Sequence, residues 1–162
     1  MNMFHHRASL VLLLASLPLA IAAKAPFAAV QGGYIALSVA DLDASVKWYA
    51  ETFDLKIVRQ RSQSPDKKAV ATILTGNGLI VELVQHAEAM ALRAAAPALS
   101  RAFQIHGIFK SGVVVDDLDA AFQELEARKV DIAFRVFNDD ALAYRTFAIR
   151  DNSGNMIQFF GK

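Results

Sequence analysis

The sequence predicts an α+β fold in which two tandem βαβββ modules form a cupped mixed sheet with their helices on its outer face. Two observations carry this prediction. Residues 39–44 (VADLDA) recur 76 positions later as residues 115–120 (VDDLDA), and residues 78–82 (GLIVE) align at the same offset with residues 154–158 (GNMIQ). A fixed offset that spans a strand–helix junction and a later strand indicates two copies of one supersecondary unit.

Module one is expected at about residues 33–86. Residues 34–40 form a short apolar run typical of a strand, and Asp41 follows as a helix N-cap because its carboxylate can accept from N–H groups of the first helical turn. Helical spacing then predicts one apolar face, made of Val46, Tyr49, Ala50 and Phe53. The remaining strands, bounded by turns at 62–68 and 76–78, are expected at residues 55–61, 69–75 and 79–85.

Module two, at about residues 106–161, repeats that order. Asp117 is the expected N-cap, and the helical face that follows contains Leu118, Ala121, Phe122 and Leu125. Strands are expected at residues 108–115, 130–137, 143–150 and 156–160, with turns at 138–140 and 152–155. The Ala-rich segment between the modules, about 87–105, is expected to form a linker helix broken at Pro97.

The N-terminus has the layout of a secretory signal peptide at residues 1–23. A polar start with Arg7 precedes an apolar run over residues 8–23, which ends in the small-residue sequence Ala20-Ile21-Ala22. The run is short for a bilayer span, which needs ~20 residues, although an uncleaved anchor is the alternative. Cleavage would leave residues 24–31 as an N-terminal segment before the domain at 32–162. The mature protein is therefore expected to be periplasmic or secreted, with no membrane association.

Composition narrows the classes of function. The chain has 162 residues and is 54% hydrophobic, which suits one domain with a substantial core. Removing Arg7 from the 17 basic residues leaves 16 against 16 acidic residues, so no basic field would attract nucleic acid or anionic lipid. The absence of cysteine excludes disulfides, thiol nucleophiles, thiolate metal sites and a lipidated cysteine.

A family resemblance rests on these modules and two of their segments. Tandem βαβββ units that carry residues 38–45 (SVADLDAS) and end with residues 145–155 (RTFAIRDNSGN) resemble the vicinal oxygen chelate superfamily. This superfamily includes glyoxalase I, the extradiol dioxygenases, and the bleomycin and fosfomycin resistance proteins. The resemblance covers about residues 32–161 and implies the fold. It leaves the reaction open, because the fold hosts many chemistries and also proteins that only bind.

Candidate site residues follow from the alternation of strand side chains between two faces. The bulky residues Ile35, Leu37 and Val39 are expected beneath the helix, which turns their neighbours toward the concave face of the cup. With the same alternation on the last strand and the offset of the repeat, the polar residues of the concave face are Tyr34, Ser38, Glu82, Lys110 and Gln158. Its apolar walls are Ile80, Val84, Val114, Met156 and Phe160.

The resemblance also implies where a metal would bind. Metal-using members hold a divalent ion with His or Gln on the first strand of a module and Glu on the last, and these positions fall on Tyr34, Glu82, Lys110 and Gln158. Only Glu82 is a strong ligand, since a charged lysine has no lone pair and repels a cation. About three good protein ligands are usual, so no metal and no other cofactor is expected. The Lys110 ammonium is expected to replace the ion and pair with Glu82, for ligand binding or for stability alone.

Three other residue types need an assignment. Arg145 could bind a ligand carboxylate or phosphate bidentately if it points into the cup, and is a solvated strand residue if it points outward. His86 and His106 are expected at the rim or surface, because each lies ~13 Å along its strand from the nearest ligand position. Trp48 suggests a contact with a second chain, so a homodimer is expected.

These observations favour an exported domain that binds a small organic ligand without a metal and without catalysis, as the sequestering members of the superfamily do. The first alternative is a metal-dependent lyase, isomerase or dioxygenase that uses Glu82, Gln158 and a further ligand. The second is a partner-binding protein with a vestigial cup. The sequence leaves open the ligand, and also whether the modules pair within one chain or exchange between chains.

Overall fold

The computed structural model describes residues 32–101, 104 and 106–161, and the predicted signal peptide at residues 1–23 and the predicted N-terminal segment at residues 24–31 lie outside this part of the chain. Module one comprises β1 (Gly33–Ser38), α1 (Leu42–Phe53), β2 (Lys56–Gln63), β3 (Ala69–Gly76) and β4 (Leu79–His86). Module two comprises β5 (Ser111–Val114), α3 (Leu118–Ala127), β6 (Asp131–Asp139), β7 (Tyr144–Arg150) and β8 (Met156–Gly161). The predicted order of two βαβββ modules is confirmed.

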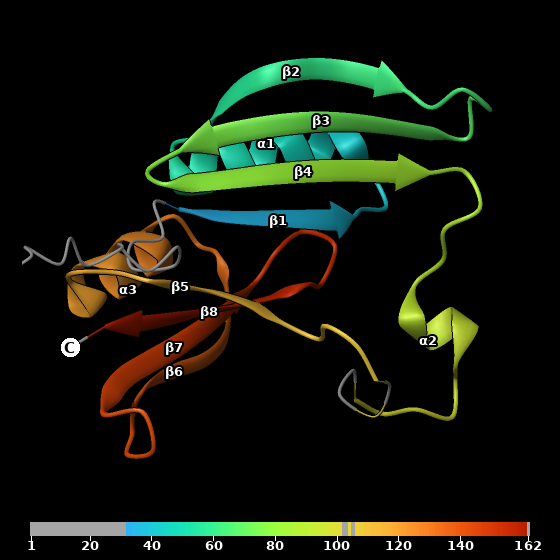
Figure 1. Ribbon diagram of the computed structural model, residues 1–162. Coiled ribbons are helices and arrows are strands. Elements are labelled where there is room, and N and C mark those ends of the chain that lie inside the picture. Colours follow the sequence, from blue (N-terminus) through green and yellow to red (C-terminus); the bar gives the residue numbers. More distant parts are fainter. Residues whose placement is uncertain (1–31, 102–103, 105, 162) are drawn as a thin grey trace, which may run out of the picture. The chain divides into compact units, whose positions relative to one another are not determined.

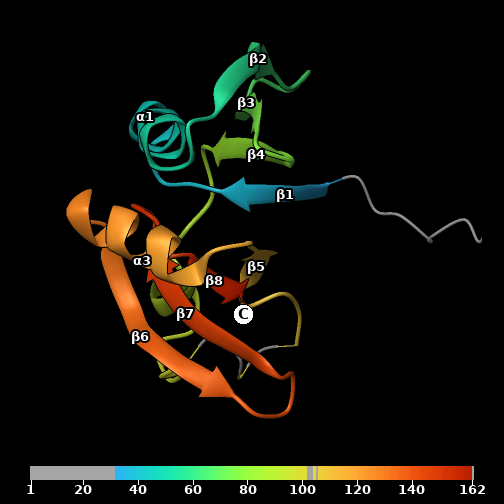
Figure 2. The same ribbon diagram turned by 90° about the vertical axis from the view of Figure 1, so that its left-hand side faces the viewer.

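The strands form two four-stranded sheets with the orders β1-β4-β3-β2 and β5-β8-β7-β6. In each sheet the first strand runs parallel to the last, and the other pairs are antiparallel. The mixed α+β architecture is therefore as predicted, although the described strands form two sheets and not one continuous ladder. Figures 1 and 2 show α1 along one face of the first sheet and α3 along one face of the second.

The internal repeat keeps the 76-residue offset predicted from the sequence in the outer strands of each module in chain order, β1 and β4 or β5 and β8, and at the helix starts. Ala36 pairs with Glu82 between β1 and β4, and the equivalent pair between β5 and β8 is Gly112 with Gln158. The N-caps also match, since Asp41 accepts a hydrogen bond from the Ala44 amide at 3.0 Å and Asp117 accepts one from the Ala120 amide at 2.9 Å. Both predicted caps are confirmed.

The inner strands of each module in chain order, which are β2 and β3 in module one and β6 and β7 in module two, follow an offset of 75 residues, shorter by one. The pair Ile57–Leu74 between β2 and β3 recurs as Ile132–Ile149 between β6 and β7, and both irregularities of the first ladder recur in the second. One residue is lost before β6 and one is gained in the β7–β8 turn. This slip matters for the site, because a shift of one residue exchanges the two faces of a strand.

The helix-covered faces of both sheets form the core. Val81 and Leu83 of β4 are 2% and 0% exposed, whereas Ile80, on the opposite face of the same strand, is 43% exposed. In β8 the corresponding residues Ile157 and Phe159 are each 3% exposed. The predicted alternation is confirmed, and it leaves one face of each sheet without a covering helix.

Aromatic packing extends this core between the modules. Phe53 stacks on Phe159 of module two, with ring centroids 6.1 Å apart, and Tyr49 stacks on Phe53 at 5.9 Å. Trp48 is half-buried and lies edge-on to Tyr49 at 4.8 Å. Its ring is thus engaged within its own chain.

A buried carboxylate joins α1 to the β7–β8 turn. Asp151 is 5% exposed and accepts a hydrogen bond from the Tyr49 hydroxyl at 2.8 Å. The backbone amides of Ser153 and Asn155 donate to the same carboxylate at 2.9 and 2.8 Å, as does the Asn155 side chain at 2.8 Å. Four donors therefore satisfy a charge that would be costly to bury alone.

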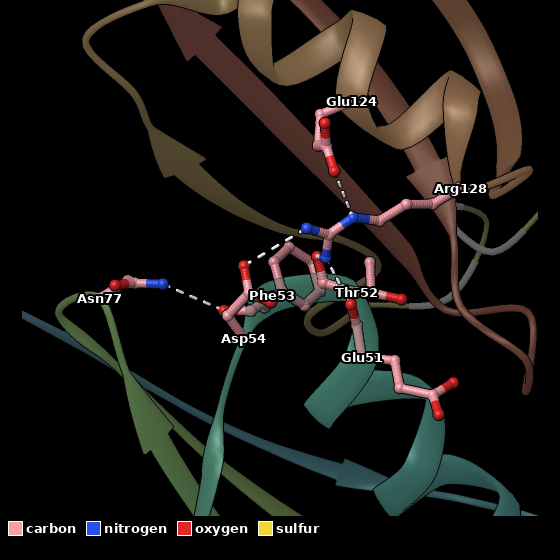
Figure 3. Close-up of polar contacts among 7 residues, drawn as sticks. All are labelled: Glu51, Thr52, Phe53, Asp54, Asn77, Glu124 and Arg128. Atoms are coloured by element: carbon pink, nitrogen blue, oxygen red, sulfur yellow. Dashed lines mark hydrogen bonds and ion pairs between the residues drawn. The ribbon is translucent and has the colours of Figure 1, made fainter.

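A guanidinium makes the second polar junction (Figure 3). Arg128, which ends α3, donates to the carbonyls of Glu51 and Thr52 and forms an ion pair with Asp54 at 3.4 Å. Glu124 binds the Nε of the same guanidinium at 2.7 Å. The last carbonyls of a helix have no intrahelical partner, and a cation there also complements the helix dipole. Arg128 thus caps α1 from the other module.

The structure differs from the sequence predictions in three segments. Among the described linker residues the α-helix is limited to one turn, α2 (Leu92–Ala95), which has no buried residue to stabilise it in spite of its alanine content. The strand expected from residue 108 begins at Ser111, and β6 continues through the turn predicted at 138–140 to Asp139. In the described part of the chain, no helix has the length and apolar character required to span a bilayer.

The Tyr49–Asp151 hydrogen bond gives a prediction about stability. Tyr49→Phe should lower the free energy of unfolding at pH 7 by about 1.5–3 kcal/mol, because it removes a buried hydrogen bond to a charged group. Chemical denaturation would measure this. Tyr144→Phe is the matched control, since the Tyr144 hydroxyl makes no hydrogen bond to the described residues.

The same variant should also change the pH dependence of stability. Burial, together with the Asp151 charge and hydrogen bond, raises the pKa of Tyr49 far above its ordinary value of 10.0. A raised folded-state pKa stabilises the protein fully below pH 10, and this stabilisation is lost as the pH rises above 10. The difference between wild type and Tyr49→Phe should then shrink by about 1.4 kcal/mol per pH unit. A difference that stays constant above pH 10 would contradict the buried bond.

Candidate functional site

The concave face of module one carries a tyrosine–carboxylate pair. The Tyr34 side chain on β1 is 57% exposed, and its hydroxyl donates to the carboxylate of Glu82 on the neighbouring strand β4. Tyr34 pairs in register with Ile80, and Glu82 with Ala36, so the two polar side chains lie diagonally on the same face. The pair is open to solvent and is flanked by exposed apolar surface.

The concave face of module two carries a lysine–amide pair. The Lys110 ammonium, just before β5, donates to the side-chain oxygen of Gln158 on β8. Gln158 is only 4% exposed, and its amide nitrogen donates to the hydroxyl of Thr146 on β7 at 2.8 Å. The Thr146 hydroxyl in turn donates to the carbonyl of Phe159 at 2.6 Å.

These two pairs occupy equivalent positions of the repeat. The partners of each pair have the same separation along the chain, and Lys110 and Gln158 are the repeat equivalents of Tyr34 and Glu82. The structure thus brings together, pair by pair within each module, the residues that the sequence assigned to the concave face.

The ion pair expected between Lys110 and Glu82 is wrong. Each side chain is instead bound by its neighbour on the adjacent strand of its own module, Gln158 for Lys110 and Tyr34 for Glu82. The ion pairs among the described residues do not include one between these two charges. Contacts between neighbouring strands form in preference to the Lys110–Glu82 pair, because the sheet already holds neighbouring side chains at contact distance. A pair between modules depends instead on how the modules dock.

Ser38 lies at the other end of the module-one face, where it lines a pocket of about 210 Å³. His86 and Ser153 are the other polar residues of the pocket, and Met90 contributes apolar surface. His86 is half-buried, with its Nδ1 accepting from the Glu88 amide at 3.1 Å. His86 therefore lies at the rim of the concave face, as the sequence predicts.

Arg145 points away from the concave face. Both of its terminal nitrogens bind the Asp119 carboxylate on α3, at 2.7 and 2.8 Å, on the helix side of the sheet. This hydrogen bonding lowers the pKa of the Asp119 carboxyl and raises the pKa of the Arg145 guanidinium. The one-residue slip of the inner strands explains the outcome, because it matches Arg145 with Val70, which packs against the core, and not with Ala69. The outward alternative is the one that the structure shows.

Thr146 is a neighbour of the candidate site that the sequence analysis did not identify. It is fully buried, and it pairs in register with Phe160 across the β7–β8 hairpin. That register turns it toward the same face as Gln158. Applying the alternation to β7 with the correct hairpin register would have identified it.

The comparisons with known proteins agree with this geometry. A sequence profile of the Glyoxalase/Bleomycin resistance protein/Dioxygenase superfamily matches residues 32–159. The chain belongs to this superfamily. The predicted vicinal oxygen chelate resemblance, which denotes the same group of proteins, is thereby confirmed. A search of curated proteins finds no match.

Solved structures of the superfamily share the fold. A glyoxalase family protein from Enterococcus faecalis has a TM-score of 0.64 at 16% identity, covering 83% of this chain and 98% of that one. TioX from Micromonospora sp. ML1 has a TM-score of 0.57 at 20% identity, with 80% and 97% covered. Lactoylglutathione lyase from Agrobacterium tumefaciens has a TM-score of 0.55 at 20% identity, with 85% and 96% covered. Likeness at these identities shows the fold and leaves function to the site.

The Tyr34–Glu82 pair gives a prediction that can be read directly. The hydrogen bond to Glu82, with partial desolvation and the charge of that carboxylate, raises the pKa of Tyr34 above its ordinary value of 10.0. Glu82→Gln should therefore lower the Tyr34 pKa toward its ordinary value, as measured by NMR titration of ¹³C-labelled tyrosine rings. Glu51→Gln, on the exposed side of α1, is the matched control. An equal Tyr34 pKa in wild type and Glu82→Gln would show that the pair does not form in solution.

Proposed function

We propose that this protein is an exported binding protein that holds a small amphipathic organic molecule on its concave faces without a divalent metal. The observation that carries the proposal is that the predicted concave face of each module has one charged side chain held by an uncharged strand neighbour, with the two pairs at equivalent positions of the repeat. Within the pairs the charges are exchanged, since Glu82 is the equivalent of Gln158 and Lys110 is the equivalent of Tyr34.

Exposed apolar side chains support this use of the concave faces. Tyr34, Ile80 and Val114 are 57%, 43% and 70% exposed, whereas core residues on the opposite faces are nearly inaccessible. Clustered exposed apolar surface beside a few polar groups is typical of ligand sites. The pocket at Ser38 adds a partly enclosed end of about 210 Å³.

The donor set at the four inherited positions does not suit a divalent ion. The Glu82 carboxylate already accepts a hydrogen bond from the Tyr34 hydroxyl, and the Gln158 oxygen already accepts one from the Lys110 ammonium. A cation would have to displace both donors and tolerate the lysine charge. Among the described residues, no three His, Asp or Glu side chains are grouped closely enough to hold a metal. These observations support the proposal of metal-free binding over a metal-dependent lyase, isomerase or dioxygenase.

Export is the second part of the proposal. Its support is the sequence of residues 1–23, with Arg7, the apolar run and Ala20-Ile21-Ala22. N-terminal sequencing of protein recovered from the producing cells is expected to begin at Ala23 or Lys24. Protein that still begins at Met1 would show that the segment is retained.

Binding and metal dependence can be tested together by thermal unfolding. A library of small amphipathic molecules should contain compounds that stabilise the native chain equally with and without EDTA, by RT ln(1 + [L]/Kd). Zinc and nickel titrations of the native chain should show no micromolar binding. Lys110→His should raise affinity for these ions because it replaces a cation with a ligand, whereas Lys129→His, at the end of α3, should not.

Two results would count against the proposal. Micromolar or tighter binding of zinc or nickel by the native chain would favour the metal-dependent enzyme. Stabilisation by organic compounds that disappears with EDTA would do the same.

A further inference from the structure

We infer that the concave face of module two is a carboxylate subsite built on Lys110, so that the ligand is an organic anion with an apolar body. This inference rests on the proposed function and specifies the class of molecule that the site takes.

The Gln158 amide is held in one orientation by Thr146. The Thr146 hydroxyl has one proton, which it donates to the Phe159 carbonyl at 2.6 Å. Its oxygen can therefore accept from the Gln158 amide nitrogen, which lies at 2.8 Å. The opposite amide orientation would break this chain and would also place the Gln158 N–H groups against the Lys110 ammonium. Burial of both Thr146 and Gln158 makes such losses costly, so the amide oxygen is held toward Lys110.

The charge of Lys110 is not paired with a carboxylate among the described residues. Its hydrogen-bond partner is a neutral amide, which does not offset the positive charge and leaves two further N–H donors. The two acids of β6, on the same sheet, are already engaged. Asp131 pairs with Arg150 at 3.5 Å, and Asp139 accepts from amides of the β6–β7 turn at 3.1 and 3.2 Å. Among the described residues, Lys110 therefore has no carboxylate partner.

The surface around the Lys110 ammonium is apolar. The Phe109 ring centroid lies 5.4 Å from the Lys110 nitrogen, and Val114, on the same face, is 70% exposed. Gly112 lies between Lys110 and Val114 in the alternation, and a Cβ there would lie 3.4 Å from the Phe160 ring, so this ring supplies the apolar surface at that position. Lys110 and Val114 are separated by ~13 Å along the chain. A ligand whose carboxylate binds Lys110 could thus lay an apolar body against the Phe160 ring and toward Val114.

The charged side chain on the concave face of module one, Glu82, has a different kind of partner. Glu82 accepts from a phenol, which leaves an acceptor-rich group on that face, whereas Lys110 donates to an amide and leaves donors. Because neither charge neutralises the other, each can act on a ligand. Of these two groups, only Lys110 offers a cation to an anionic ligand.

The test compares two probes of the same shape, 4-phenylbutyrate and its primary amide, by NMR titration of the full mature protein. The acid should bind at least about tenfold more tightly than the amide, which corresponds to about 1.4 kcal/mol. The side-chain amide signals of Gln158 should shift on binding. Lys110→Met should abolish the preference, Lys110→Arg should retain it, and Lys47→Met, which removes an exposed charge from α1, should leave it unchanged. Inorganic phosphate, which has no apolar body, should bind more weakly than the acid.

The outcomes separate this inference from the proposed function. If acid and amide bind the concave face equally, or if the preference survives Lys110→Met, the carboxylate subsite is wrong and the binding face stands. If phosphate binds as tightly as the acid, the apolar body is wrong. If neither organic probe shifts any concave-face signal at millimolar concentration, the subsite is wrong, and the library titration then decides the proposed function separately.

Discussion

The structure depends on one constraint: each module has one helix to cover a four-stranded sheet. Side chains of a strand alternate between two faces, so a single helix can bury only half of them. In β4 this places Val81 and Leu83 in the core and leaves Ile80 and Glu82 on the other side. In β8 the repeat again places Ile157 and Phe159 on the helix side and Gln158 on the other side, although Gln158 is itself only 4% exposed. The faces without a helix are therefore a direct consequence of the βαβββ unit, and Tyr34, Ile80 and Val114 are exposed on them.

The junctions between modules keep these faces in a defined arrangement without a disulfide. Asp151 is held by four donors from α1 and from its own turn, and Arg128 of module two caps the end of α1. Phe53 and Phe159 stack across the same junction. Removing a partner from a buried charge strongly destabilises the folded protein. These contacts therefore favour one arrangement of the two modules.

Local patterns predicted most of the fold and the face on which most of the candidate site residues lie. The repeat and the alternation identified both modules, both N-caps, and the concave placement of Tyr34 and Glu82, because these depend on backbone geometry within a few residues. Arg145 could not be assigned, since one residue lost before β6 and regained after β7 reverses its face without disturbing the flanking motifs.

The Lys110–Glu82 pair failed for a different reason. It required a contact between modules, and the way two modules dock depends on the packing of many side chains, not on the repeat. Thr146 was missed because its role follows from the hairpin register of β7 with β8, which a one-residue difference in turn length changes. The linker helix was overpredicted because alanine content favours a helix only weakly when no apolar face is buried.

The central claim is that small organic molecules bind on the concave faces and need no metal. The most direct measurement is an NMR chemical-shift map of fragment binding to the protein, recorded with and without EDTA. Metal-free binding predicts shifts at Tyr34, Ser38 and Gln158 that are the same in both conditions. Shifts confined to the helix-covered faces, or shifts at the concave face that vanish with EDTA, would contradict it.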